Sequence, residues 1–224
     1  MNSKSFRKWL TVSIVVLIAL LVIFSGYNLS KQAAVTEGEI TNNLTIATSF
    51  YPIYIMALNL TKDVPGVELV NIAQPDMGCI HDIQLSTSDL KLLEKSDIFI
   101  INGLGMENYL TRVYENTPNL KIIDSTANFD WAVLEDCEHE HGSEHEHEHP
   151  NPHTWLSVTL AMEQVQEIAA KLCLLDPAHK ELYTKNAAEY TAKLEALRTK
   201  MKQEFEDLSS TNIVIFQDAF VYFA

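Results

Sequence analysis

The sequence predicts an α/β fold built around a parallel sheet, and two observations carry that prediction. Short apolar runs with the length and composition of buried strands recur after residue 43. Helix-like segments separate them, and strands that alternate with helices at this spacing form βαβ units whose ligand sites lie at the carboxyl ends of the strands. The expected strands are residues 44–49, 67–72, 97–101 and 120–124.

The segments between these strands carry helix and turn signals. A helix is expected from Pro52 to about Leu60, and a Ser/Thr/Asp cap opens another over residues 86–94. Asn102-Gly-Leu-Gly105 is predicted to be a tight turn into a helix. It lacks the third glycine of a dinucleotide-binding loop, and Glu107 places a carboxylate where a phosphate would have to approach. The two glycines therefore supply backbone freedom and no phosphate site.

Two helices are expected in the second half of the chain. Residues 156–172 have apolar side chains at helical spacing, with Cys173 in the core. Pro177 begins a second helix that continues to about Leu208, and at about 1.5 Å per residue it would measure ~45 Å. A helix longer than a small domain is wide usually connects two bodies. A further strand is expected at residues 213–216.

The amino terminus has the pattern of an export signal. Three basic residues precede sixteen uncharged, mostly apolar residues from Trp9 to Phe24. This length lies between a signal peptide and a short membrane anchor, because a span takes about 20 helical residues. No cysteine follows the apolar run, as the anchor of a bacterial lipoprotein would require. We expect residues 1–27 to be a signal peptide or anchor and residues 28–43 a polar tether, so that the rest is exported.

Residues 135–150 form an acidic, histidine-rich tract that no packed core can use, so it is predicted to be a solvated loop. Histidine and carboxylate side chains alternate through it and are ligands for divalent metals. A solubilising insertion is the alternative, but the tract contains no Lys or Arg and leads directly into His153 at a helix start. Its histidines are His139, His141, His145, His147 and His149.

The net charge of −14 limits the partners of the chain. Seven of the thirty acidic residues lie between Glu135 and Glu148. This balance argues against nucleic acid and fits a surface that gathers cations.

The motifs occur in an order that resembles a known family. They are residues 74–90, the turn at 102–107, the His-rich loop, Asn-Pro-His-Thr-Trp-Leu at 151–156 and residues 216–224. In this order they resemble the metal-binding solute-binding proteins of zinc and manganese ABC importers, over roughly Leu44 to the end. The resemblance implies two α/β lobes joined by one long helix, with the metal between them. A His-rich loop marks the zinc members, so Zn²⁺ is favoured over Mn²⁺.

The family ligands can be carried over position by position. The resemblance implies His81 and His153 as ligands, with Gln217 where the family has a third histidine, and the loop histidines as auxiliary ligands. The fourth ligand, a carboxylate in the second lobe, has no counterpart in this chain. An amide oxygen is a poorer zinc ligand than imidazole. Cys79 could complete a site as thiolate or pair with Cys137 instead.

The resemblance also implies how the chain divides. Residues 44–176 would form the amino-terminal metal-binding lobe, 177–208 the linking helix and 209–224 the start of a truncated carboxyl-terminal lobe, so that the second lobe is essentially missing. We expect a fragment of a two-lobe protein, although a one-lobe remnant is the alternative.

The expected function is extracytoplasmic capture of zinc by a monomer, anchored or secreted at the extracellular face of the membrane or in the periplasm, with delivery to an ABC permease. A membrane-tethered zinc buffer without a transport role is the alternative. We expect no enzyme activity, because Asp82 is the only evident candidate base for a zinc hydrolase and the sequence has no His-Glu-x-x-His helix. Adhesion, a role found in this family, leaves no readable trace in the sequence.

Metal binding should weaken in acid. Imidazole binds a metal only when neutral, so we expect zinc affinity to drop below about pH 6, where histidine becomes protonated. Zinc titrations at pH 7.5 and pH 5 check this expectation. Equal affinity at the two pH values would contradict imidazole ligation.

Overall fold

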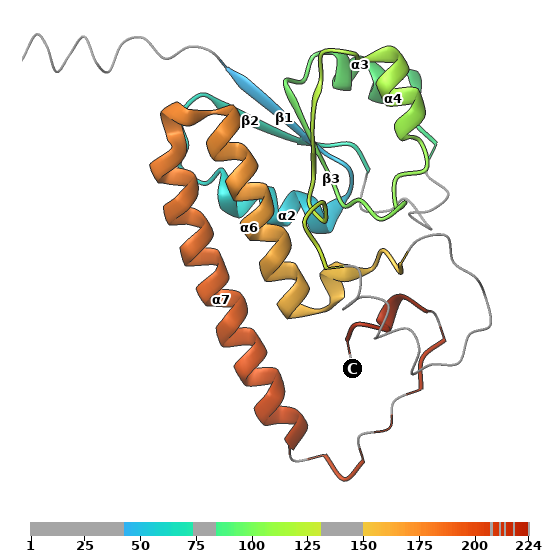
Figure 1. The fold of residues 1–224 in the computed structure, drawn as a ribbon, viewed down its shortest axis with the longest axis vertical. Coiled ribbons are helices and arrows are strands. Elements are labelled where there is room, and N and C mark those ends of the chain that lie inside the picture. Colours follow the sequence, from blue (N-terminus) through green and yellow to red (C-terminus); the bar gives the residue numbers. More distant parts are fainter. Residues whose placement is uncertain are drawn as a thin grey trace, which may run out of the picture. The chain divides into compact units, whose positions relative to one another are not determined.

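The four expected strands form one parallel sheet in the order β2-β1-β3-β4 (Figure 1). The computed structural model describes residues 43–73, 84–130, 150–206, 208–210, 212, 214–216 and 218–223. The strands are β1 (Leu44–Thr48), β2 (Val67–Asn71), β3 (Ile98–Ile101) and β4 (Lys121–Asp124). Ile46 of β1 lies opposite Leu69 of β2 and Ile98 of β3. Because every pairing is parallel, all four carboxyl ends lie at the same edge of the sheet.

The two inner strands are buried on both faces, which explains why they are continuous apolar runs. Every residue of β3 is buried, and so are Ile46 and Ala47 of β1. Figure 1 shows α2 (Tyr51–Leu60), α6 (Val158–Leu175) and α7 (Lys180–Glu206) on one side of the sheet, and α3 (Thr87–Glu94) and α4 (Leu110–Asn116) on the other. The predicted α/β lobe with flanking helices is therefore confirmed.

Helix α3 begins at the predicted cap. The Ser86 hydroxyl oxygen accepts a hydrogen bond from the backbone N–H of Asp89 at 3.2 Å, and the Asp89 carboxylate accepts one from the backbone N–H of Ser86 at 2.7 Å. These reciprocal bonds form a capping box, which satisfies N–H groups that have no partner within the helix. Leu93 is buried and holds the helix against the core.

Helices α6 and α7 form an antiparallel pair, in which α6 packs on the sheet and α7 packs on α6 and α2. The buried residues Ala161, Val165, Ile168 and Leu172 of α6 recur every three or four positions and face the core. A single turn, η3 (Pro177–His179), leads into α7. Asn186 joins α7 to the end of α2, since its Nδ2 donates to the carbonyls of Leu60 at 2.9 Å and Lys62 at 2.7 Å.

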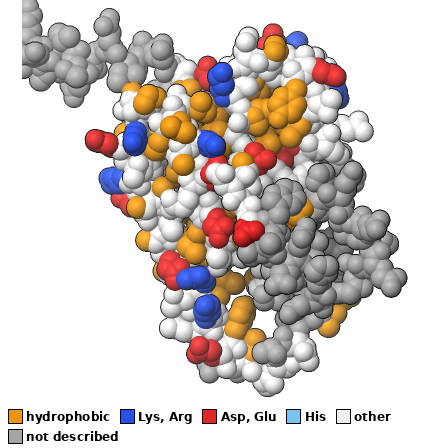
Figure 2. All heavy atoms as spheres, viewed as in Figure 1, with side chains coloured by type: hydrophobic (Ala, Val, Ile, Leu, Met, Phe, Trp, Pro, Cys, Tyr) orange, Lys and Arg blue, Asp and Glu red, His pale blue; other side chains and the backbone are white. Residues whose placement is uncertain are grey.

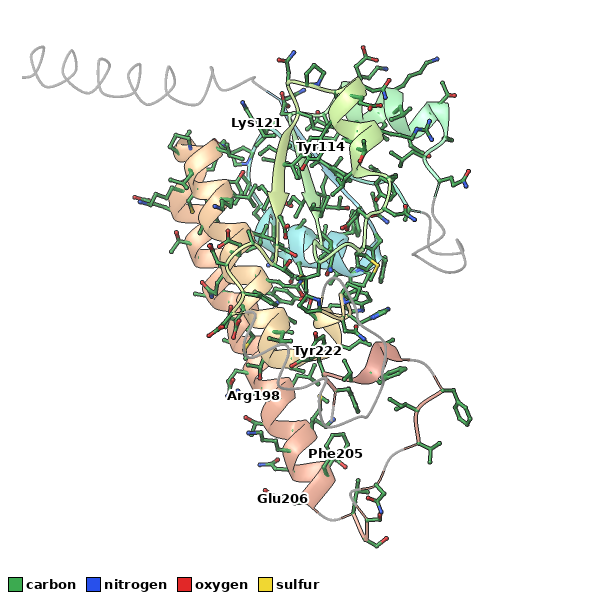
Figure 3. All side chains as sticks on the ribbon, turned by 45° about the vertical axis from the view of Figure 1, so that its right-hand side comes forward. Tyr114, Lys121, Arg198, Phe205, Glu206 and Tyr222 are labelled. Carbon is green, nitrogen blue, oxygen red and sulfur yellow. The ribbon has the colours of Figure 1, made fainter. Side chains whose placement is uncertain are left out.

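The long helix that the sequence predicts is present as η3 followed by α7. Its 27 residues span about 40 Å. Tyr183, Asn186 and Ala187 are buried in its first third, whereas Leu197 and Phe205 are exposed further along. Figure 3 labels Arg198, Phe205 and Glu206 in this second half. Tyr190 and Leu194 also pack against the core, so α7 belongs to the packed core up to about its middle.

The strand predicted at residues 213–216 is wrong for the residues that the structure describes. Val214, Ile215 and Phe216 are irregular, and the side chains of Val214 and Phe216 are 82% and 95% exposed. A strand needs a neighbouring strand for its hydrogen bonds, and these three residues pair with neither edge of the sheet. The apolar composition was therefore a poor guide to strand formation here.

Several predicted segments fall outside the described residues. These are the signal or anchor at 1–27, the tether at 28–43 apart from Asn43, and the histidine-rich loop apart from Pro150. Within the residues that are described, no helix is long and apolar enough to cross a membrane.

Removing the α3 cap should destabilise the lobe. We expect Ser86→Ala to lower the free energy of unfolding by about 1 kcal/mol, because the N–H of Asp89 loses its acceptor. Urea denaturation measures the change. Thr87→Ala alters the adjacent exposed position and serves as the control. Equal effects of the two substitutions would contradict the capping role.

Candidate metal site

His153 is the one predicted metal ligand that lies in the described part of the chain. His81, Gln217 and the histidines at 139, 141, 145, 147 and 149 fall outside it, as do Cys79 and Cys137. Cys173 is described and packs half-buried against the core, as predicted. His153 and its neighbours therefore make up the described part of the candidate site.

His153 immediately precedes a single helical turn, η2 (Thr154–Leu156). The side-chain oxygen of Asn151 accepts a hydrogen bond from the backbone N–H of His153 at 3.0 Å and lies 2.7 Å from ring atom Nδ1. Because this oxygen can only accept, Nδ1 carries the ring proton. The lone pair of the neutral ring then lies on Nε2, the atom that a metal would bind.

Aromatic contacts place His153 near the carboxyl end of β1. The ring of Trp155 lies 5.1 Å from that of His153 and 4.9 Å from that of Phe50, measured between ring centroids. Phe50 is buried and comes two residues after β1. The candidate ligand therefore lies beside the sheet edge where ligand sites of parallel sheets occur, as the sequence predicts.

Asn102 ties the segment before His153 to the end of β3. It is fully buried, and its Nδ2 donates to the carbonyls of Pro152 at 2.9 Å and Gly103 at 3.1 Å. Its Oδ1 accepts a hydrogen bond from Nε2 of Gln164 in α6 at 3.1 Å. The Ser125 hydroxyl, which follows β4, donates to the carbonyl of Asn102 at 2.9 Å. One asparagine thus joins two strand ends and α6 to residues 151–153, which we call the ligand segment.

The turn after β3 is held by a buried carboxylate. Oε1 of Glu107 accepts the N–H of Asn102 at 2.8 Å, and Oε2 accepts the N–H of Gly103 at 3.1 Å. Gly103 has a φ of +94°, and an added Cβ would overlap the side chains of Asp124 and Thr126. The carboxylate occupies the N–H groups that a phosphate would need, which confirms that this turn is no dinucleotide site.

Burial raises the pKa of two acids at this edge. Burial raises the pKa of Glu107, although hydrogen bonds from the backbone of Asn102 and Gly103 partly lower it. Burial likewise raises the pKa of Asp124, against hydrogen bonds from Thr126. Both carboxylates accept backbone N–H groups of the turns in which they lie, so their roles are structural.

The C-terminal segment returns to the ligand segment. Tyr222 follows η4 (Asp218–Phe220), and its hydroxyl donates to the carbonyl of Asn151 at 2.9 Å. Its buried ring packs in a small apolar cluster with Phe129, Leu104 and Leu160. Figure 3 shows Tyr222 near the amino-terminal end of α6. The segment that follows position 217 is therefore in direct contact with the residues next to His153.

Asn102, Gln164 and Tyr222 were not predicted from the sequence as residues of the site. Two of them carried a signal, because Asn102 directly follows a buried strand at the ligand edge and Gln164 is a polar residue on the apolar face of α6. Tyr222 carried none, since its partner lies 71 positions away.

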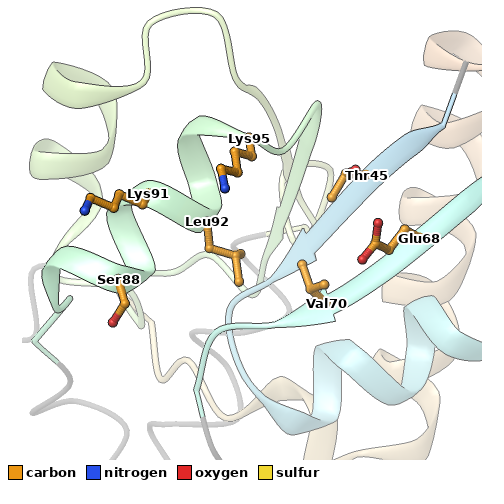
Figure 4. A pocket seen from close by; sticks show the side chains of 7 residues that line it. All are labelled: Thr45, Glu68, Val70, Ser88, Lys91, Leu92 and Lys95. Carbon is orange, nitrogen blue, oxygen red and sulfur yellow. The ribbon is translucent and has the colours of Figure 1, made fainter.

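The described part of the chain contains no cluster of metal-ligating side chains, at His153 or elsewhere. No group of three or more His, Cys, Asp or Glu side chains lies close enough to hold a metal among the described residues. Acidic and basic side chains are interspersed over the face in Figure 2. A pocket of about 500 Å³ between α3 and strands β1 and β2 has two lysines and a single acid (Figure 4). Its lining is Thr45, Glu68, Val70, Ser88, Lys91, Leu92 and Lys95.

Comparison with known proteins points to one family. Residues 46–224 match the family described as zinc-uptake complex component A, periplasmic (ZnuA). The chain is 29% identical over 224 residues to the high-affinity zinc uptake system protein ZnuA of Bacillus subtilis, covering 98% of this chain and 68% of the relative. It is 27% identical over 211 residues to the manganese-binding lipoprotein MntA of Halalkalibacterium halodurans, covering 93% and 65%.

The fold comparison agrees. A crystal structure of ZnuA superposes with a TM-score of 0.68 at 26% identity, covering 81% of this chain and 66% of that one. The chain thus spans about two thirds of the length of these relatives.

The raised pKa of Glu107 predicts how a neutral replacement behaves with pH. The folded protein binds the Glu107 proton more tightly than the unfolded chain, so this residue lowers stability as pH rises above the ordinary pKa of 4.5. We expect the unfolding free energy of the wild type to fall relative to that of Glu107→Gln between pH 4.5 and 7.5. Urea denaturation of both proteins across this range measures the difference. The raised pKa is contradicted if the unfolding free energy of the wild type minus that of Glu107→Gln stays constant or increases with pH.

Proposed function

The chain belongs to the ZnuA family of metal-binding solute-binding proteins of ABC uptake systems, and from this premise we propose that it captures zinc outside the cytoplasm and delivers it to an ABC importer. The family is non-enzymatic, which confirms the expectation that the chain is not an enzyme. The membership of the chain in this family also confirms the resemblance that the ordered motifs indicated.

The state of His153 is the observation that carries the proposal. Its ring is held by Asn151 with the proton on Nδ1, so that Nε2 of the neutral ring can act as a donor atom. It lies at the carboxyl edge of a parallel sheet, next to the ends of β1 and β3. An imidazole in this tautomer and at this edge is suited to binding a divalent cation.

Described residues close in sequence to the other proposed ligands support a shared site. His81 comes ten positions after the carboxyl end of β2, which ends at Asn71. Gln217 directly precedes η4, and Tyr222 after η4 contacts Asn151. The end of β2 pairs with the end of β1, and the segment that follows Gln217 contacts Asn151. This supports a single site to which His81, His153 and Gln217 contribute.

We propose that the site binds zinc, and manganese is the second candidate. Imidazole suits zinc, and the auxiliary loop histidines would raise the local concentration of zinc further. Gln217 offers an amide oxygen, a donor that suits harder cations such as manganese. The relatives carry zinc, manganese and iron in their names, so identity alone does not choose among these metals.

Delivery of the metal requires a membrane partner and a location outside the cytoplasm. We propose an ABC permease as the partner and the outer face of the membrane or the periplasm as the location, with the chain acting as a monomer. The family description and the basic, apolar amino terminus support this location. A tethered zinc buffer would differ in one measurable respect, since all of its binding would reside in the histidine-rich loop.

Calorimetry with zinc separates these two functions. We expect residues 28–224 to bind one zinc ion tightly, and this site to survive deletion of residues 138–149. His81→Ala or His153→Ala should weaken the tight site at least tenfold, because each removes a ligand. His179→Ala is the matched control, since His179 bonds to Asp176 at 2.7 Å far along the chain from the proposed ligands.

Loss of all binding with the loop would overturn the transport proposal in favour of the buffer. Tighter binding of manganese than of zinc at the surviving site would overturn the choice of metal.

A further inference from the structure

Two side chains from distant parts of the sequence hold successive carbonyl groups just before His153. Asn102 donates to the carbonyl of Pro152 at 2.9 Å across 50 positions, and Tyr222 donates to the carbonyl of Asn151 at 2.9 Å across 71 positions. Both side chains are buried. The ligand segment is therefore held by its backbone from two sides.

We propose that Asn102 and Tyr222 are positioning residues that preset His153 for metal binding, an inference that rests on the proposed function. Held carbonyls fix the backbone of residues 151 and 152. Asn151 in turn places its side-chain oxygen against both the backbone N–H and the ring Nδ1 of His153. The two contacts thus determine where the ring lies and which tautomer it adopts. A ligand that is ordered before the metal arrives loses less entropy on binding.

The surroundings of Asn102 make it suited to this task. Its backbone N–H is held by Glu107 and its backbone carbonyl by Ser125. Its Oδ1 accepts from Gln164, so the orientation of the amide is set and Nδ2 faces Pro152. Rotation of the amide would place two donors against each other and leave the Pro152 carbonyl without this bond. The amide is therefore a rigid link between the sheet and the ligand segment.

Tyr222 adds a contact from the segment that follows position 217. Its ring is fixed by Phe129, Leu104 and Leu160, so its hydroxyl is presented at a defined position. Metal binding at His153 and docking of the C-terminal segment are consequently linked through the carbonyl of Asn151. By reciprocity, weakening this contact weakens metal binding.

The chain provides a matched control for each residue. Asn186 is also a buried asparagine whose Nδ2 donates to two backbone carbonyls, but these belong to Leu60 and Lys62. Tyr183 is also a buried tyrosine whose hydroxyl donates a hydrogen bond, but to Asp176 at 2.8 Å. Both controls lose the same kind of bond away from His153.

The test measures zinc affinity of the full chain by competition with a chelator, at a temperature where every variant is folded. We expect Asn102→Ala to weaken zinc binding about tenfold, at the lower end of the effect of residues that orient metal ligands. Tyr222→Phe, which removes one hydroxyl, should weaken it about threefold, since it leaves the Asn102 contact in place. Asn186→Ala and Tyr183→Phe should lower the melting temperature and leave affinity within twofold of the wild type. In a His153→Ala background, neither Asn102→Ala nor Tyr222→Phe should weaken binding further.

The outcomes are distinguishable. Unchanged affinity in Tyr222→Phe and Asn102→Ala, with a clear loss in His153→Ala, overturns the positioning role and leaves the proposed function standing. Equal losses in the controls show a general effect of instability and overturn the inference too. Unchanged affinity in His153→Ala overturns the ligand assignment itself, and the inference with it. If Asn102→Ala does not fold, the Tyr222→Phe and Tyr183→Phe pair decides alone.

Discussion

The parallel pairing of β1 with its neighbours is the constraint on which the candidate site depends. Because β2, β1, β3 and β4 run in the same direction, the residues that follow them gather at one edge. Phe50, Asn102 and Ser125 all follow strands and all lie in the contact network described above. Helix α6 carries Gln164 into that network on its buried face. The place of residues 151–153 is thus a consequence of strand direction and helix packing.

Glu107 and Asn102 are both engaged by hydrogen bonds at this edge, and this limits the chemistry of the edge. Glu107 accepts the N–H groups of its own turn, so that turn cannot hold a phosphate. The amide of Asn102 is bonded on both of its polar atoms. His153 differs in kind, because its neutral ring can place a lone pair on Nε2 while Nδ1 is held. We therefore expect this edge to hold a metal rather than an anion.

The long helix α7 extends beyond the part of it that is buried. Its first part is bound to the core by Tyr183, Asn186 and Ala187, and its second part exposes Leu197 and Phe205. The Phe205 ring lies 6.1 Å from that of Phe223, so the end of α7 contacts the returning C-terminal segment. A helix can continue beyond its packed part because its backbone hydrogen bonds are internal. A strand cannot, and the exposed residues 214–216 are irregular for that reason.

The sequence by itself determined the local elements: the strands as buried apolar runs, the cap at Ser86, the glycine turn after β3 and the long helix. Each depends on neighbours within a few positions, where periodicity and turn chemistry are readable. The ordered motifs also identified the family. Metal binding by His153 stays a prediction, as does metal binding by His81, Gln217 and the loop histidines, which lie outside the described residues.

Only the tertiary structure decided which polar atoms meet across 50 and 71 positions, as in the contacts of Asn102 with Pro152 and of Tyr222 with Asn151. It also decided that residues 214–216 form no strand. A hydrogen bond between distant residues forms only after the chain has folded, so no local pattern records it. The sequence therefore names a candidate ligand, and the packing of the sheet, α6 and the C-terminal segment determines how that ligand is held.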